Sequence, residues 1–181
     1  MRAKPFSIRG FLGLEGERWV PVHGVFPMSK AQDVVKAVDA FFAERQSRLD
    51  AHDIHHSYLS SINGQFWLLE PMFYWMDEVP EFHMRYLDRK RYAKFDTIPA
   101  NPDARAAVME VRTELRDLFH GLGAVSAQIG KFYNLPDALE PETYAVLTSI
   151  KEECGRAHRL FMHVNMVMQK LLCSWLIQGP M

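Results

Sequence analysis

Cysteine, net charge and long apolar runs are all scarce in this sequence, and each absence limits what the chain can be. The two cysteines, Cys154 and Cys173, imply no disulfide framework, so we expect a reducing, cytoplasmic location. A formal net charge of −1 provides no field that would attract nucleic acid or an anionic membrane. The apolar tail over residues 160–177 is interrupted by polar and charged side chains, and we expect no membrane insertion.

Several motifs of self-contained chemistry are also absent. The chain has no Gly-x-Gly-x-x-Gly after a strand, no Gly-x-x-x-x-Gly-Lys-Ser/Thr, no Gly-x-Ser-x-Gly and no His-Glu-x-x-His. Nucleotide binding by such loops, serine hydrolysis and zinc proteolysis are therefore unsupported. What is present is a chain of 181 residues, 48% hydrophobic and 24% charged, which is long enough to bury the core of one compact domain.

The first predicted elements are a strand and an amphipathic helix. Residues 18–28 are rich in β-branched and aromatic side chains, which predicts a strand in two short parts that closes at Pro27. Ser29 is predicted to be the N-cap of a helix over residues 30–49. Apolar side chains recur there at helical spacing, and they are Val34, Val35, Val38, Phe41, Phe42 and Leu49.

A β-hairpin is predicted next. Residues 54–62 and 65–73 flank Asn63-Gly64, the strongest short-range hairpin signal, and Pro71 is expected to end the ladder.

The remaining pattern completes an α+β domain. A second helix is predicted from Asn101-Pro102 to about Leu122, a strand over residues 124–130, and a last helix over residues 140–153. The order strand, helix, strand, strand, helix, strand is that of a split βαβ or ferredoxin-like fold, with an antiparallel sheet and both helices on one face.

Two aromatic clusters, residues 19–24 and 70–77, combine large rings with polar tips, as the wall of a small-molecule pocket does. A second interpretation is open: His23 is then a hydrogen-bonded interior histidine, and four aromatic residues are core, namely Trp19, Trp67, Tyr74 and Trp75. In the predicted strand 124–130, Ser126 and Gln128 share one face, with Lys131 and Tyr133 just beyond it. Such a row could orient a carboxylate or an oxyanion, although strand alternation alone also explains it.

Histidines and a charge run are the remaining candidates. His52, His55 and His56 lie at a loop-to-strand boundary, where alternation directs the last two to opposite faces, so we expect no metal site there. The set Cys154, His158 and His163 lacks a fourth ligand at a characteristic spacing. The charged residues within 85–91 favour a solvated surface, or a surface that faces a partner domain.

Three segments taken together resemble the C-terminal region of FAD-linked oxidases. They are WVPVHGVFPMS (residues 19–29), LEPMFYWMD (residues 69–77) and GAVSAQIGKFY (residues 123–133). The resemblance is to the vanillyl-alcohol oxidase superfamily, which includes D-lactate and glycolate oxidases. It extends over residues 18–150, in order and roughly in spacing.

The resemblance implies a cap domain over residues 18–153, between an N-terminal extension (1–17) and a divergent tail (154–181). In that family the cap sheet lies over the ring of an FAD that a separate domain holds, with a small alcohol or hydroxy acid between them. The implied cofactor is FAD, and the implied partner is an FAD-binding domain or subunit.

Five residues are the site candidates that the resemblance implies. His23 is the general base or the residue that orients the substrate. Lys131 balances a substrate carboxylate or an anionic flavin, Tyr74 and Gln128 donate hydrogen bonds, and Trp19 lines the pocket.

The chain also departs from the family. No FAD-binding domain precedes the cap, Ser126 stands where the similar strand would carry a histidine, and the tail lacks the family's Asn-Pro-Gly element. We therefore expect no activity without a partner. Two alternatives stay open: a non-catalytic binding module, and a degenerate fragment that retains only the cap fold.

Overall fold

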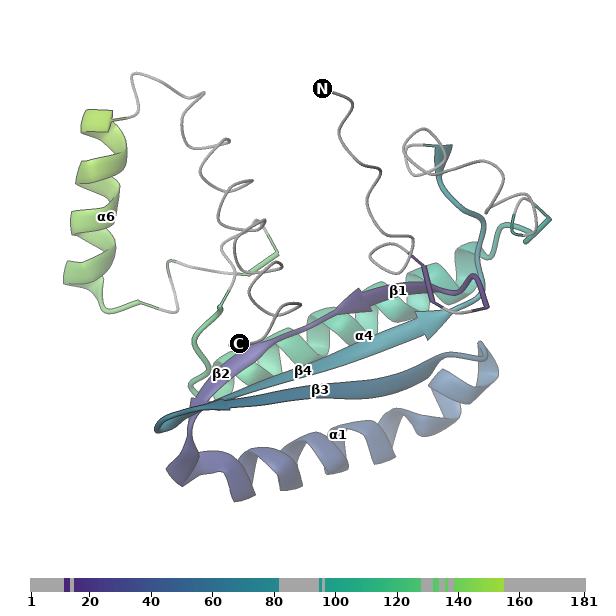
Figure 1. Ribbon diagram of the computed structural model, residues 1–181, viewed down its shortest axis with the longest axis horizontal. Coiled ribbons are helices and arrows are strands. Elements are labelled where there is room, and N and C mark those ends of the chain that lie inside the picture. Colours follow the sequence, from purple (N-terminus) through teal and green to yellow (C-terminus); the bar gives the residue numbers. More distant parts are fainter. Residues whose placement is uncertain are drawn as a thin grey trace, which may run out of the picture. The chain divides into compact units, whose positions relative to one another are not determined.

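The structure is a computed structural model that describes residues 12–13, 15–81, 95, 97–127, 132–133, 136 and 139–154. The chain divides into two compact units, Met1–Gly123 and Ala124–Met181. In the first unit the elements are β1 (Arg18–Pro21), β2 (Gly24–Pro27), the 3-10 helix η2 (Met28–Lys30), α1 (Ala31–Ala51), β3 (His55–Asn63), β4 (Phe66–Trp75) and α4 (Pro102–Gly121) (Figure 1). An antiparallel four-stranded sheet with helices confirms the predicted α+β class.

The strand β4 is the centre of the sheet. It pairs with β3 along one edge and with β1 and β2 along the other, all antiparallel. β3 and β4 join through Gly64 and Gln65, and Gly64 has a φ of +60°, which a glycine adopts without strain. The predicted hairpin is confirmed. Each strand begins one residue later than predicted, and β3 and β4 end at Asn63 and Trp75, slightly beyond the predicted C-terminal ends.

The gap between β1 and β2 is a local loss of hydrogen bonds, since both strands follow the same register on β4. Pro21 pairs with Met72 and Gly24 pairs with Leu69, so Val22 stands opposite Pro71. The Val22 amide donates to the Pro71 carbonyl at 2.9 Å, but Pro71 has no N–H to return the bond. The expectation that Pro71 ends the ladder was wrong, because proline removes one bond and β4 continues past it to Trp75.

Side chains of β4 alternate between the two faces of the sheet. Its odd-numbered residues from 67 to 75 are buried, whereas the even-numbered ones between them are partly exposed. The buried set faces the helices: the ring of Phe73 lies 5.8 Å from Phe42 of α1. On the neighbouring strand, Phe26 of β2 meets Phe119 of α4 edge-on at 5.3 Å.

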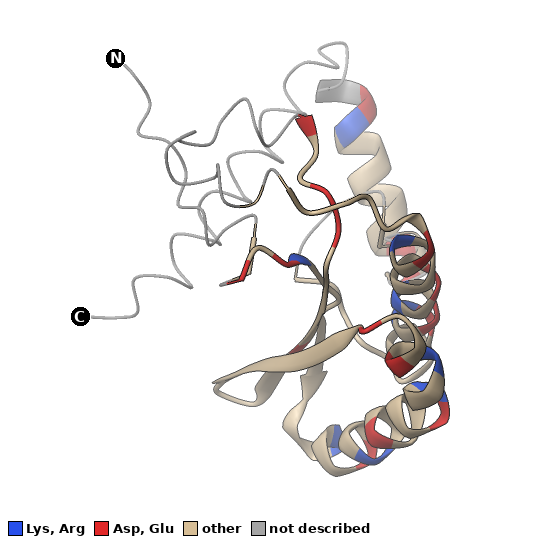
Figure 2. Ribbon diagram, turned by 90° about the vertical axis from the view of Figure 1, so that its right-hand side faces the viewer, with Lys and Arg blue, Asp and Glu red and all other residues tan. Residues whose placement is uncertain are grey.

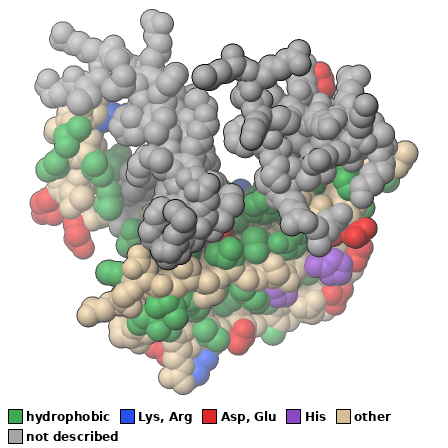
Figure 3. All heavy atoms as spheres, viewed as in Figure 1, with side chains coloured by type: hydrophobic (Ala, Val, Ile, Leu, Met, Phe, Trp, Pro, Cys, Tyr) green, Lys and Arg blue, Asp and Glu red, His purple; other side chains and the backbone are tan. Residues whose placement is uncertain are grey.

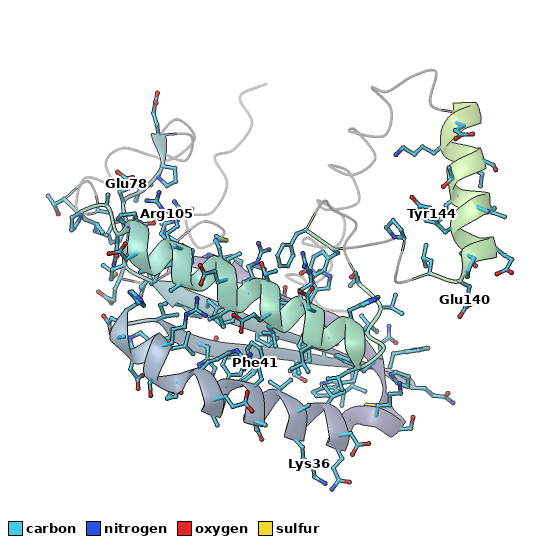
Figure 4. All side chains as sticks on the ribbon, turned by 180° about the vertical axis from the view of Figure 1, so that it is seen from behind. Lys36, Phe41, Glu78, Arg105, Glu140 and Tyr144 are labelled. Atoms are coloured by element: carbon cyan, nitrogen blue, oxygen red, sulfur yellow. The ribbon has the colours of Figure 1, made fainter. Side chains whose placement is uncertain are left out.

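Both helices lie on one face of the sheet and pack against each other (Figures 2 and 4). Arg45 of α1 donates to Glu114 of α4 at 2.6 Å, and Arg48 of α1 pairs with Glu110 and Glu114. Arg45 also lies 3.8 Å above the ring of Phe41. The two helices thus share a charged outer seam over an apolar core.

Two details of α1 differ from the prediction. Val35 is 43% exposed, because it sits one position off the stripe formed by Val34 and Val38. Ser29 lies within η2, and α1 begins at Ala31 with no side-chain cap, since the 3-10 turn supplies the entry to the helix instead.

The second unit contains one described helix, α6 (Pro141–Cys154), as predicted for that segment (Figure 4). The predicted strand over residues 124–130 is reduced, within residues 124–127, to a single bridging residue, Val125. Residues 128–130 and the charge run at 85–91 lie outside the described residues. Over the part of the chain that the structure describes, no helix has both the length and the apolarity needed to cross a bilayer.

Replacing Phe73 with alanine is predicted to destabilise the first unit by about 3–5 kcal/mol, because the ring is fully buried and its loss leaves a cavity. Phe66 is the matched control on the same strand. It is 57% exposed, so Phe66→Ala should change the free energy of unfolding by less than about 0.5 kcal/mol. Urea unfolding followed by circular dichroism measures both. Equal losses would contradict the alternation of β4.

Candidate functional site

The sheet face that points away from α1 and α4 gathers most of the described candidate residues, and we call it the distal face. Its members follow from the register and the alternation. They are Trp19, Pro21, His23, Val25 and Pro27 in the segment of β1 and β2, Phe66, Leu68, Glu70, Met72 and Tyr74 on β4, and His55, Ser57, Leu59, Ser61 and Asn63 on β3. Figure 3 shows hydrophobic side chains over the strands on the side turned to the viewer.

Three of the five candidate residues lie on this face. Trp19 and Tyr74 are direct cross-strand partners, and His23 lies on the same side of the same strand line as Trp19. Gln128 and Lys131 lie outside the described residues.

The aromatic clusters divide by alternation. Trp67 and Trp75 are buried in the core, as the core interpretation expects. Trp19 and Tyr74 are half-buried on the distal face. The two interpretations of the sequence each describe half of the aromatic residues, because neighbouring positions of one strand have opposite environments.

His23 is buried and electrically neutral near pH 7. Its side chain is 3% exposed, and burial, reinforced by the nearby Arg112 cation, lowers its pKa from 6.5 to about 4. Arg112 reaches this region from α4 and donates from Nε to the Pro21 carbonyl at 3.1 Å. A neutral imidazole can both donate and accept a hydrogen bond, but a pKa this low makes it a weak base.

Glu70 is a distal-face carboxyl that the candidate set omitted. It is half-buried, and burial raises its pKa above the ordinary glutamate value. The register that sets Pro21 against Met72 and Gly24 against Leu69 also sets His23 against Glu70. Alternation along the strand that follows the Asn63-Gly64 turn predicts that Glu70 and Tyr74 share a face. The pairing of Glu70 with His23, by contrast, depends on strands that are far apart in sequence.

Tyr74 carries the hydroxyl of this face. Its oxygen accepts from the Ser57 hydroxyl at 3.4 Å, and its O–H donates to the Met72 sulfur at 3.5 Å. A thioether is a weak acceptor, so an oxygen acceptor of a ligand can take this hydrogen bond in its place.

A second charged cluster lies where β4 ends and α4 begins. The Asp77 carboxylate accepts two bonds from Arg105, each at 2.7 Å, and one from the indole of Trp75 at 3.2 Å. The backbone amides of Glu78 and Asn101 complete its shell at 2.9 and 2.8 Å. Figure 4 shows Glu78 and Arg105 close together at this end of α4.

This cluster has a structural role. Burial raises the pKa of Asp77, but the hydrogen bonds from Arg105, Asn101 and Trp75 outweigh burial and hold the pKa at about 2. Arg18 of β1 borders the cluster: burial lowers its pKa, Asp77 opposes that shift, and its Nε is buried without a hydrogen-bond partner among the described residues. All the carboxylate's acceptor capacity is engaged by the protein, so the cluster fixes the loop rather than presenting a reactive group.

The histidines at the start of β3 are separated by the sheet. His55 is exposed and lies 3.2 Å from the Asp53 carboxylate, while the ring of His56 stacks on Phe42 at 4.0 Å on the helix side. Among the described residues no three His, Cys, Asp or Glu side chains converge as metal ligands would. His158 and His163 lie outside the described residues.

Comparison with known proteins adds nothing to this geometry: no protein family, curated protein or solved structure matches the chain.

Asp77→Asn is predicted to destabilise the protein by about 2 kcal/mol at pH 7 and to remove part of its acid sensitivity. The folded-state pKa of about 2 lies below the ordinary value of 3.8, so the stabilisation is complete above pH 3.8 and is lost as the pH falls through 2. Urea unfolding between pH 2 and pH 7 measures this. Met109→Ala, an exposed change on α4 that removes no titratable group, is the control and should keep the wild-type pH profile. If the free energy of unfolding of wild type and of Asp77→Asn changed in parallel with pH, this stabilising role of Asp77 would be refuted.

Proposed function

We propose that this chain is the substrate-covering cap of an FAD-dependent oxidoreductase that oxidises a small alcohol or hydroxy acid. The observation that carries the proposal is the common face of Trp19, His23 and Tyr74, which come from two separate motifs of the resemblance. Both described helices that pack on this sheet lie on its other face, and we assign the distal face to a ligand and a partner domain.

The distal face suits the ring of a flavin better than the rest of FAD. Trp19, Met72 and Tyr74 offer a half-buried surface of rings and a thioether, on which a flat aromatic system can pack. The described members of the face include no lysine or arginine that would neutralise a diphosphate. The proposal therefore assigns the diphosphate and the adenosine to an FAD-binding domain or subunit.

The flavin, when bound, takes the hydride from the substrate carbon. The chain's own residues bind and orient the alcohol: Trp19 packs against it, the Tyr74 phenol donates a hydrogen bond, and the neutral His23 imidazole holds the hydroxyl. Gln128 and Lys131 stay in the proposal as donors for a substrate carboxylate. The low pKa of His23 favours orientation over proton abstraction as its task.

A non-catalytic binding module is the second candidate. It is favoured by the half-buried aromatic residues of the distal face, which could bind a ligand without any flavin.

The proposal also keeps the cytoplasmic location expected from the two cysteines.

Flavin reduction tests the proposal. The chain, combined with an FAD-binding domain or subunit, should bleach the flavin absorbance when D-lactate, glycolate or vanillyl alcohol is added. Trp19→Ala should slow the bleaching at least about tenfold, since about 1.4 kcal/mol of lost packing corresponds to that factor. Val35→Ala, an exposed change on α1, is the control and should match wild type. A complex that forms without flavin, or one whose flavin no probe reduces, would favour the binding module.

A further inference from the structure

Glu70 and His23 occupy a cross-strand pair in which side chains approach closely. The Val22 amide bonds to the Pro71 carbonyl, which makes Val22 and Pro71 the hydrogen-bonded position of the ladder. The next position, His23 opposite Glu70, is then a non-hydrogen-bonded one. At such positions the Cβ atoms of an antiparallel pair lie about 4.5–5.5 Å apart. The register thus places the carboxyl and the imidazole at directly opposed positions on the distal face.

The other neighbours of Glu70 on this face are apolar. Leu68 and Met72 flank it along β4, and Leu59 is its partner on β3. Leu59 and the two β4 neighbours supply no hydrogen bond to stabilise a carboxylate, which is why burial raises the pKa of Glu70. The titratable groups that share the distal face with Glu70 are His23 opposite it, Tyr74 on the same strand and His55 opposite Tyr74, and the Arg112 cation acts on His23.

We propose that Glu70 is the catalytic base of the oxidation and that His23 is the residue that positions it. The inference rests on the proposed function. As the substrate carbon gives up its hydride with the bonding electron pair to the flavin, the O–H bond breaks, its proton passes to the Glu70 carboxylate, and a C=O bond forms. With substrate bound, the neutral His23 imidazole would donate a hydrogen bond to the carboxylate and keep it directed at the hydroxyl.

A titration of the full-length chain alone tests the pair. With ¹³C-labelled glutamate and ¹⁵N-labelled histidine, the imidazole resonances of His23 should report the protonation of Glu70 as a distinct step. Glu70→Gln should abolish that step, and Glu44→Gln, an exposed change on α1, should leave it in place. Circular dichroism checks that both variants fold. Identical His23 titrations in wild type and Glu70→Gln would overturn the pair. If Glu70→Gln does not fold, the ¹³C titration of Glu70 gives the same test: its midpoint should shift in His23→Gln, and an unchanged midpoint would overturn the pair.

Activity in the flavin-loaded complex tests the role. With D-lactate, glycolate and vanillyl alcohol as probes, Glu70→Gln should slow flavin reduction by about 10²–10⁴-fold and remove the rise of the rate with pH that deprotonation of Glu70 produces. His23→Gln should have a smaller effect and shift the midpoint of the pH profile. A wild-type complex that reduces its flavin while Glu70→Gln keeps both rate and profile refutes the role of Glu70 alone. A wild-type complex that reduces no flavin refutes the proposed function, and with it the role.

Discussion

The first unit depends on the register of β4, the strand on which every other strand pairs and both helices pack. Because side chains alternate, a single register sends Trp67, Phe73 and Trp75 into the core and Glu70 and Tyr74 to the distal face. A slip by one residue would exchange the two sets, burying a carboxyl and exposing three aromatic rings. The register that buries these aromatic side chains in the core therefore also determines which side chains form the candidate site.

Pro71 is the one place where the central strand breaks a rule of sheets. Its missing N–H costs a ladder bond of about 1 kcal/mol, and the burial of Val22 opposite it offsets a cost of that size. The missing hydrogen bond lies next to His23. The main chain at the candidate site is therefore stabilised more by packing and less by ladder hydrogen bonds than the rest of β4. The Arg112 side chain donates a hydrogen bond to the Pro21 carbonyl and so connects β1 to α4.

Local patterns predicted the elements, and pairing between distant segments was beyond them. The Asn63-Gly64 turn and the apolar periodicity of α1 and α4 act within one or two turns of chain, so the sequence alone located the hairpin and both helices. The opposition of His23 and Glu70, by contrast, follows from pairing between two strands that a helix and another strand separate in sequence. Such a pairing is set by the whole core, which no short window of sequence contains.

Asp77 and Glu70 show how one strand and the loop after it give two carboxyls opposite properties. Asp77 receives five hydrogen bonds, two of them from Arg105, and its pKa falls to about 2 despite burial. Glu70 has apolar neighbours on two sides, and its pKa rises. A carboxylate saturated by donors stabilises a fold and has little basicity left, whereas one held among apolar groups gains a proton readily. Of the two carboxyls, the less solvated Glu70 is therefore the more basic, and the fully bonded Asp77 stabilises the junction with α4.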